Sequence, residues 1–363
     1  MNNSDIAHRR LHNQGLSKLR FADPGDVVAQ LGAVQAQDYA GAKWALGQRI
    51  QNATDAAIDQ LFNEGRILRT HIMRPTWHFV TPADIRWMLE LTAPRVHAAN
   101  AFMYRKLELE DPIFKRSNSA LAKALRGRKH LTRSELKSVL QQAGIDADGL
   151  RLGYLLMRAE LDGVICGGAR RGKQFTYALL EERVPQVKAI SREEALAELT
   201  RRYFRSRGPA TLQDFVWWSG LTRVDAKKGI EMVKSQFVNE VLDGQTYWFA
   251  NFGSPAPYRE KSLRAYLLPN YDEYFIGFRD RSAIGEVIRR SNLPENSPAF
   301  IAHIIILAGQ IVGGWRRTLK RDAVVVEINL ITNLTKTEKR AIAEAANRYG
   351  VFLDLRTELA GVD

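Results

Sequence analysis

The segment LTRSELKSVLQQAGIDADGLRLGYLLMRAELDGVICGGARRGKQFTYALL, residues 131–180, decides the fold class. Thr132 is followed three residues later by Glu135, and this capping-box spacing predicts the start of a helix. Apolar residues recur at helical spacing over 148–161, which predicts a second helix. A glycine-rich turn between two apolar runs predicts a β-hairpin over 164–180. The unit is therefore two helices followed by a hairpin.

Two further copies of this unit flank the middle one. Downstream, Ser191 and Thr211 each begin a helix with a capping box, and 241–249 forms a hairpin. Upstream, Asp23-Pro24 begins a helix with proline at its first position, and 67–80 supplies the β segment. Helix-turn-helix units followed by a β-wing commonly set a helix and the wing against DNA. The repeat therefore predicts three tandem winged-helix units.

The pattern changes from about residue 258, where β-rich segments replace the helical repeat. The most apolar of them turns at Ala308-Gly309 and is expected to form a hairpin instead of a membrane span. A capping box at Thr335 then predicts a long helix. The expected fold class is α+β, with winged helices at 1–110, 111–187 and 188–257 and a β-rich domain at 258–363.

Length and charge restrict the classes of function. The 363 residues exceed the size of one hydrophobic core, about 250 to 300 residues, so several folding units are expected. Hydrophobic residues make up 45% and charged residues 26%, which excludes a disordered chain. Lys and Arg total 53 against 40 Asp and Glu, a net charge of +13. This excess predicts a polyanionic partner.

The cysteine count and the N-terminus indicate a cytoplasmic protein. Cys166 is the single cysteine, so one chain has no intramolecular disulfide and no multi-thiolate metal site. The N-terminal residues lack the apolar core of a signal peptide. His71 and His78 are seven residues apart, which matches no common zinc motif. No metal and no cofactor are expected.

The segment 34–39, Val-Gln-Ala-Gln-Asp-Tyr, is the most unusual local sequence. Gln35 and Gln37 alternate, so in an extended turn their amides point the same way. Glutamines in turns are usually solvated, which is the simpler interpretation. Asp38 precedes the helix that begins near Tyr39 and is expected to cap it.

Several ordered motifs resemble the AlkZ-like family of winged-helix bacterial DNA glycosylases. They are Gln35-Ala36-Gln37-Asp38, the segment LRTHIMRPTWHFV at 68–80, the segment LLPNYDEY at 267–274 and Gly313-Gly314-Trp315-Arg316-Arg317. The resemblance covers nearly the whole chain. Its motifs are specific because several agree in order, whereas a bare glutamine pair is weak.

The resemblance implies three winged helices around a concave DNA-binding surface and a barrel-like C-terminal domain. It also implies cleavage of the glycosidic bond of N7-alkylated guanine, and in some members release of interstrand crosslinks. The family has a branch with two catalytic glutamines around an apolar residue and a branch with aspartate at the second position. Gln35 and Gln37 resemble the first branch and inherit its catalytic role.

The chemistry is compatible with glutamines. An amide oxygen accepts hydrogen bonds but is a negligible base, so Gln35 and Gln37 can position water without taking its proton. N7 alkylation gives the purine a positive charge, and the base departs neutral without a general acid. Amide oxygens near the oxocarbenium-like sugar would stabilise its developing charge. The expected selectivity is for a reactive, cationic leaving group.

Two nearby residues leave alternatives open. Asp38 stands beside the pair and is an alternative base, although capping explains it and adjacent side chains diverge. Lys43 lies one or two turns along the following helix, and a lysine in the site could form a Schiff base. No lysine adjoins the glutamines in sequence, so a monofunctional glycosylase is expected.

Candidate DNA contacts lie at the expected wings and beside the glutamines. Wing cations reach a phosphate backbone while a helix approaches a groove, although charge clusters are also common on solvated surfaces. Trp77, Trp87 and the pair Trp217-Trp218 are assigned to packing more readily than to base stacking. The candidate contacts are Tyr39, His71, Arg74, Arg170, Arg171, Lys173, Arg316 and Arg317.

The expected partner is double-stranded DNA containing an alkylated purine, with no membrane partner and a monomer favoured. The alternative is a DNA-binding transcriptional regulator, since winged helices and a charge of +13 need no catalysis. A regulator would prefer a sequence and bind undamaged duplex stably. The natural adduct, base flipping and the choice between general repair and self-resistance are open at this stage.

Overall fold

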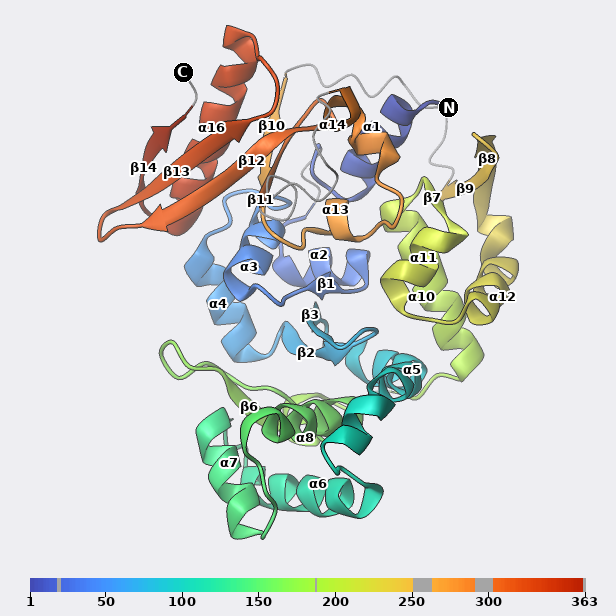
Figure 1. The fold of residues 1–363 in the computed structure, drawn as a ribbon, viewed down its shortest axis with the longest axis vertical. Helices are drawn as coiled ribbons and strands as arrows, with labels where there is room; N and C mark the ends of the chain where they lie inside the picture. Colours follow the sequence, from blue (N-terminus) through green and yellow to red (C-terminus); the bar gives the residue numbers. More distant parts are fainter. Residues whose placement is uncertain (18–20, 187, 251–262, 291–302, 362–363) are drawn as a thin grey trace.

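The computed structural model describes residues 1–17, 21–186, 188–250, 263–290 and 303–361. It is a mixed α/β chain with three sheets of three strands and one of five. Figure 1 shows the five-stranded sheet at one end of the molecule and the helices α6, α7 and α8 at the other, with β1 to β3 between them. Among the described helices, none is long and apolar enough to cross a membrane.

Each three-stranded sheet belongs to a unit with the same order of elements: a helix, a two-residue strand, two helices and two strands. The short strand pairs with the last strand of its unit, giving the orders β1-β3-β2, β4-β6-β5 and β7-β9-β8. The first unit, preceded by α1 (Asn3–Asn13) and followed by α5 (Ile85–Lys106), comprises α2 (Pro24–Leu31), β1 (Val34–Gln35), α3 (Tyr39–Gly47), α4 (Asp55–Glu64), β2 (Leu68–Ile72) and β3 (Thr76–Val80).

The second and third units follow without a change in this order. The second unit comprises α6 (Asp111–Leu125), β4 (Leu131–Thr132), α7 (Arg133–Gln142), α8 (Gly149–Leu161), β5 (Ile165–Gly167), β6 (Thr176–Leu179) and α9 (Leu180–Arg183). The third comprises α10 (Arg192–Arg207), β7 (Ala210–Thr211), α11 (Leu212–Ser219), α12 (Arg223–Val233), η1 (Lys234–Gln236), β8 (Phe237–Leu242) and β9 (Gln245–Ala250).

The C-terminal sheet has the order β10-β11-β12-β13-β14. Helix α16 contacts both edge strands, β10 and β14, so the sheet curls around it. The expected β-rich C-terminal domain is thus a curled sheet, whose described strands run in an open order from β10 to β14. The elements are β10 (Ala265–Leu268), α13 (Glu273–Ile276), η2 (Ser282–Ile284), α14 (Glu286–Arg290), β11 (His303–Leu307), β12 (Gln310–Leu319), β13 (Ala323–Leu330), α16 (Lys336–Leu353) and β14 (Arg356–Ala360).

Local capping signals place the helices where the sequence predicts them. Thr132, Ser191, Thr211 and Thr335 each accept the third backbone N–H of their helix, and the acid there accepts the N–H of the cap. One such cap is worth about 1 kcal/mol. Asp84 differs, because its carboxylate accepts from Thr81 and Arg202 instead of capping α5.

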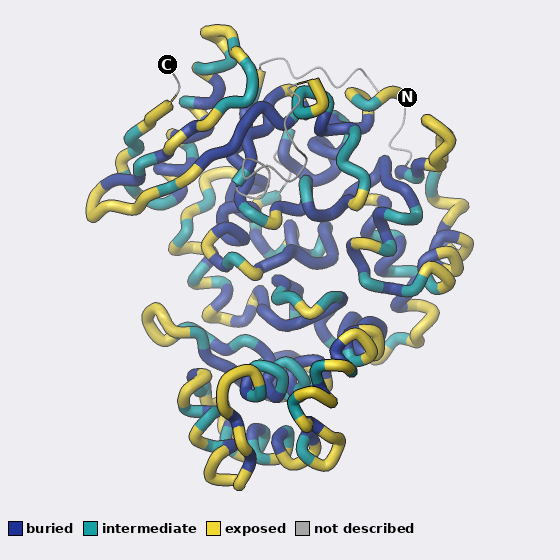
Figure 2. The backbone as a smooth tube through the Cα atoms, viewed as in Figure 1, coloured by how far each residue is buried: buried dark blue, intermediate teal, exposed yellow. Residues whose placement is uncertain are grey.

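The units differ in whether they share a hydrophobic core with their neighbours. The second unit has a core of its own, with Leu121, Leu140 and Leu155 at its centre. The helices α2 to α4 of the first unit share a core with the C-terminal sheet and α16, and α5 shares one with the third unit. Figure 2 accordingly shows a buried interior that continues across the first unit into its neighbours. The first unit is therefore held from several sides.

Candidate active site

The glutamine pair lies at the edge of the first three-stranded sheet. β1 runs antiparallel to β3, with Gln35 opposite His78. The chain then enters α3, where Asp38 accepts the N–H of Gly41 at 3.1 Å, which confirms its capping role. Gln35 is only 7% exposed, whereas Gln37 is exposed. A buried amide and a solvent-facing amide thus stand two residues apart at one strand-to-helix turn.

Three hydrogen bonds hold the backbone and the outer amide of this turn. The N–H of Ala36 donates to the carbonyl of Trp77 at 2.7 Å, and the Arg69 Nε donates to the carbonyl of Ala36 at 3.1 Å. The N–H of Trp77 donates to Oε1 of Gln37 at 3.3 Å. These bonds come from β2 and β3, so the hairpin fixes the position of the glutamines. Each amide oxygen has two lone pairs, and Gln37 can still accept from a water.

The inner amide is oriented by a cation. Arg74 donates from Nη2 to Oε1 of Gln35 at 3.0 Å. Burial lowers the pKa of Arg74, but a guanidinium stays charged at neutral pH. Arg74 follows Met73, whose φ of +60° makes the tight turn between β2 and β3. The turn at Met73 thus places the Arg74 side chain where it reaches the Gln35 amide.

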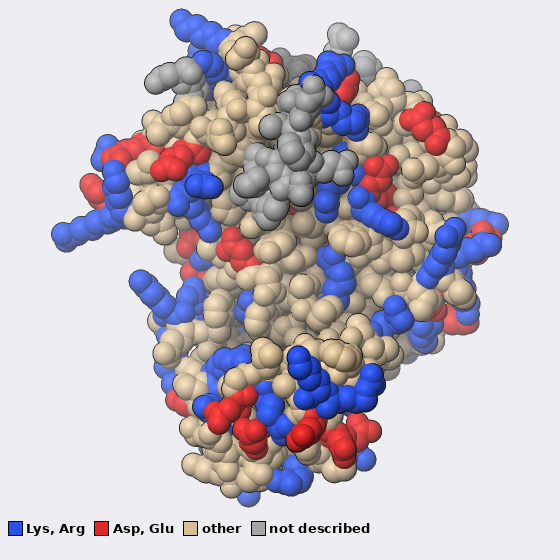
Figure 3. Space-filling view, viewed as in Figure 1, with Lys and Arg blue, Asp and Glu red and all other residues tan. Residues whose placement is uncertain are grey.

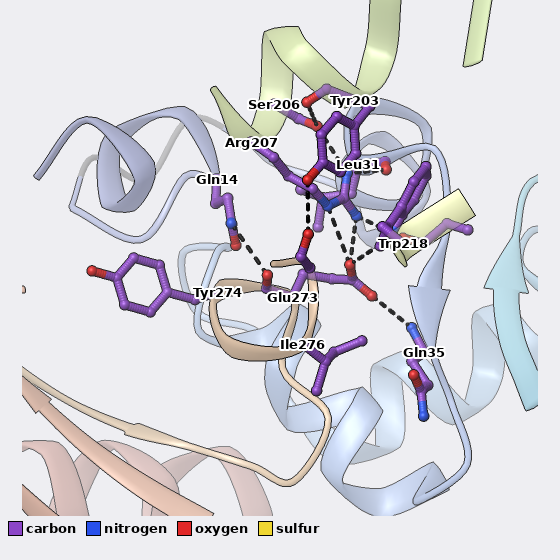
Figure 4. A network of polar contacts seen from close by, with 12 residues as sticks. Gln14, Leu31, Gln35, Tyr203, Ser206, Arg207, Trp218, Glu273, Tyr274 and Ile276 are labelled. Carbon is purple, nitrogen blue, oxygen red and sulfur yellow. Dashed lines mark hydrogen bonds and ion pairs between the residues drawn. The ribbon is translucent and has the colours of Figure 1, made fainter. Parts of the chain in front are cut away.

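A buried carboxylate from the C-terminal part anchors the backbone of Gln35 (Figure 4). Oε1 of Glu273 accepts the Gln35 N–H at 2.9 Å, and Oε2 accepts from Arg207 at 2.6 Å and from the indole of Trp218 at 2.9 Å. Arg207 also donates to the carbonyls of Leu31 and Ala33 at the end of α2. Three parts of the chain therefore meet behind Gln35.

A second buried ion pair lies beside the first. Arg49 meets Asp272 through two bonds of 2.9 Å, and both side chains are fully buried. Arg49 also donates to Oε1 of Gln14 at 3.1 Å. A planar guanidinium paired with a carboxylate in this way is geometrically specific. The two adjacent acids, Asp272 and Glu273, thus lock the segment after β10 onto the first unit.

Sequence reasoning missed these anchors. Asp272 and Glu273 lie in the segment 267–274 that carries the family resemblance, so that segment held a signal. Arg207 and Arg49 had none, because their partners are 66 and 223 residues away. Long-range ion pairs leave no local pattern.

His78 is the cross-strand partner of Gln35 on β3 and is fully buried. Its Nδ1 is 3.0 Å from the carbonyl of Thr76, an acceptor, so Nδ1 carries the proton. Burial, and then the nearby Arg74, hold the pKa of His78 well below its ordinary value. His78 is therefore a neutral ring in the native protein, which makes it a poor proton acceptor.

Tyr39 and His71, both proposed as DNA contacts, make interior contacts. Tyr39 donates to Asp59 at 2.7 Å, and burial raises the pKa of its hydroxyl. The Nδ1 of His71 bonds to the buried Glu160 of α8, and its ring lies 4.3 Å from that of Trp77. The Tyr39 contact joins α3 to α4 within the first unit, and the His71 contact joins the first unit to the second. DNA contact by either residue stays a prediction.

The cations of the loop between β5 and β6 fall into two groups. The Arg170 guanidinium lies 3.5 Å from Asp59 and over the ring of Tyr39, so the loop docks on the first unit. Arg171 pairs with Glu135 at 2.8 Å and remains half exposed, and Lys173 is exposed. The second group is the better placed for phosphate.

The two arginines of β12 differ in the same way, because one contacts the first unit and the other is exposed. Arg317 lies 3.6 Å from Asp38 and donates to the hydroxyl of Tyr349 at 2.7 Å. Arg316, on the same strand, is exposed. Asp38 is thus engaged with both its helix and a cation. Its role as an alternative base gains no further support from these contacts.

Among the described residues, no three His, Cys, Asp or Glu side chains gather as a metal site would require. Cys166 is buried, and burial raises the pKa of its thiol to about 12. A thiol in this state is not a reactive nucleophile.

Known proteins of the same architecture identify the class. A family model described as DNA glycosylase AlkZ-like matches residues 28–352. A relative from Streptomyces sahachiroi, the interstrand DNA cross-link repair glycosylase, is 22% identical over 324 residues, covering 84% of this chain and 85% of that protein. The solved structure of Streptomyces sahachiroi DNA glycosylase AlkZ superposes with a TM-score of 0.78 at 20% identity, covering 98% and 99% of the two chains.

The protein is therefore an enzyme of the DNA glycosylase class, which acts in DNA repair. The chain belongs to the AlkZ-like family, because the family model spans most of its length. The similarity of the solved structure, at 20% identity, establishes the shared fold. The resemblance first suggested by the motifs is confirmed.

Proposed function

We propose that this enzyme hydrolyses the N-glycosidic bond of N7-alkylated guanine in double-stranded DNA. The observation that carries the proposal is the turn at 35–37. The hairpin holds the buried amide of Gln35 and the exposed amide of Gln37, and Glu273 holds the main-chain N–H of Gln35. Gln37 holds the attacking water, and Gln35 stabilises the charge that develops on the sugar. The three units act as winged helices that place this turn against the duplex.

The nearby groups support a substrate that needs no acid or base. Both oxygens of the Glu273 carboxylate accept hydrogen bonds, and Asp38 caps α3. His78 is buried and neutral. A purine alkylated at N7 leaves as a neutral base, so weak hydrogen-bonding groups are sufficient. An uncharged purine would need a proton donor and is expected to be a poor substrate.

A monofunctional mechanism fits the surroundings of Lys43. Its Nζ lies 2.6 Å from Asp55 and 2.8 Å from Asp59, and the residue is 3% exposed. A lysine side chain that is engaged by two carboxylates is not free to attack the sugar. Water is therefore the proposed nucleophile. Borohydride trapping of a covalent adduct with DNA would overturn this assignment.

We further propose that the substrates include guanines linked across the two strands. The Streptomyces sahachiroi relative is named as an interstrand DNA cross-link repair glycosylase. A base tied to both strands cannot enter a closed pocket by flipping, so an open site such as the exposed Gln37 suits it. A cytoplasmic monomer acting on bacterial DNA without a cofactor is the proposed form.

The positive charge supports duplex binding. Figure 3 shows Lys and Arg side chains spread over the face in view, from the second unit to the C-terminal sheet. Exposed Arg171, Lys173 and Arg316 are the proposed phosphate contacts. Such contacts add affinity without sequence preference.

The test is single-turnover release of N7-methylguanine from a duplex by the wild type, Gln35→Ala and Gln37→Ala. Each variant is expected to lose about 100-fold in rate, because each removes an amide that acts on charge or water in the transition state. Asp38→Asn is the matched control, since asparagine also caps a helix, and its rate is expected within about threefold of wild type. A wild type without activity, or a large loss in the control alone, would refute the assignment of the glutamine pair.

A further inference from the structure

The two consecutive tryptophans of α11 have different environments. Trp218 is fully buried and donates its indole N–H to Glu273. Trp217 is 44% exposed. Consecutive helix residues point about 100° apart, so only one of the two can face the core. The expectation that both serve packing therefore holds for Trp218, and Trp217 needs another explanation.

Trp217 is held in place although it is exposed. Its indole N–H donates to the carbonyl of Ile276 at 3.2 Å, which fixes one edge of the ring. The guanidinium of Arg74 lies over the ring at 5.9 Å from its centroid, at the outer limit of a cation–π contact, and the side chain still leaves 44% of its surface exposed. Single exposed apolar side chains are common on protein surfaces, but this ring is also held in one orientation by its hydrogen bond to Ile276.

The same arginine connects this ring to the catalytic candidate. Arg74 donates to Oε1 of Gln35 at 3.0 Å, and its guanidinium neighbours Trp217. Ile276, which holds the indole, belongs to the short helix that begins with Glu273, and Glu273 accepts the N–H of Gln35. Trp217 and Gln35 are therefore positioned by the same two elements. The indole therefore lies next to the arginine that orients the Gln35 amide.

We propose that the exposed face of Trp217 stacks on the alkylated purine whose glycosidic bond is cleaved. This rests on the proposed function, and adds the residue that binds the base to those that act on the sugar. Indole has the strongest attraction of the aromatic side chains for a cationic group, and N7 alkylation makes the purine a cation. Because the ring is already anchored, little conformational entropy is lost on stacking.

Three variants distinguish stacking from packing. Trp217→Ala removes the ring, Trp217→Leu keeps an apolar side chain without a π face, and Trp217→Phe keeps a ring but loses the N–H. Phe102→Ala is the matched control, because Phe102 is an exposed aromatic, 65% accessible, on α5. Release of N7-methylguanine is measured under single-turnover conditions with enzyme below saturation, together with binding to undamaged duplex and the thermal unfolding midpoint.

Trp217→Ala and Trp217→Leu are expected to release the base about 10-fold more slowly, as for loss of one stacked base, while Trp217→Phe stays within about threefold of wild type. Binding to undamaged duplex, the unfolding midpoint and Phe102→Ala are expected to be unchanged. Equal rates for Trp217→Leu and Trp217→Phe, or a wild-type rate for Trp217→Ala, would overturn the stacking proposal. A wild type that releases no base would refute the proposed function itself. If the wild type is active and Gln35→Ala is inactive, the proposed function stands and the Trp217 variants test only the stacking role.

Discussion

The turn at 34–38 and the loop at 169–173 occupy different parts of two units with the same order of elements. The turn is surrounded by buried partners from three parts of the chain, including Arg74 and Glu273. The loop carries Arg171 and Lys173 on its exposed side and contacts the first unit through Arg170. The contrast shows that the repeated order of elements supplies a common scaffold, and that the copy with the proposed catalytic glutamines is the one with buried polar partners around its turn.

The energetics of the two regions differ accordingly. The pair Arg207–Glu273 is almost completely buried, so removal of one partner leaves a charge without compensation, at a cost of about 3 to 5 kcal/mol. The pair Arg171–Glu135 is about half exposed, and such pairs contribute about 0 to 1 kcal/mol. The two ion pairs are similarly short, 2.6 Å and 2.8 Å, but their contributions to stability differ because their burial differs.

The largest expected effect comes from breaking the buried pair. Glu273→Gln keeps an acceptor for the Gln35 N–H but leaves Arg207 uncompensated, so the free energy of unfolding should fall by about 3 to 5 kcal/mol. Chemical denaturation measures this. Glu135→Gln is the matched control in the loop region, with an expected loss below about 1 kcal/mol. Equal losses in the two variants would remove the distinction between the regions.

An intermediate effect is expected for the histidines of the two regions. His78 is the cross-strand partner of Gln35 at the turn, and His130 accepts the N–H of Ala169 in the loop. Burial lowers the pKa of both, and much further for the fully buried His78. As pH falls below about 6.5, the two imidazole rings bind protons in the unfolded chain but stay neutral in the native protein. The free energy of unfolding therefore decreases, by up to about 1.4 kcal/mol per pH unit for each ring.

Histidine NMR titration of the folded protein checks this order. His130 is expected to protonate at a higher pH than His78, which stays neutral until the protein unfolds. His130→Asn and His78→Asn provide the signal assignments. A His78 signal that titrates near pH 6.5 in the folded state would contradict the buried, neutral ring.

The smallest effect is expected on the surface of the loop. Lys173→Ala removes one exposed cation, so affinity for duplex should fall uniformly across sequences and the salt dependence should weaken by about one phosphate contact. Binding isotherms at several salt concentrations measure both quantities. Lys336→Ala, an exposed cation at the start of α16, is the control and should change neither. A loss confined to damaged DNA would place Lys173 in lesion recognition instead.

Local patterns allowed much of the fold to be predicted. Capping boxes such as Thr132 with Glu135 located helix starts, because their partners are three residues apart. The turn at Ala308-Gly309 was likewise readable, and both residues have positive φ in a two-residue hairpin. The family membership followed from ordered motifs. The roles of Gln35 and Gln37 and the domain boundaries remain predictions.

The long-range partners and the burial of these motifs were decided only by the tertiary structure. Arg207 and Glu273 meet across 66 residues, and no periodicity indicates such a pair. Trp217 and Trp218 are identical in sequence terms, yet only packing determines that one is buried and the other exposed. Curling of the C-terminal sheet around α16 depends on the same long-range contacts. Short-range hydrogen bonding is encoded by neighbours, whereas burial and charge pairing depend on residues that only folding brings together.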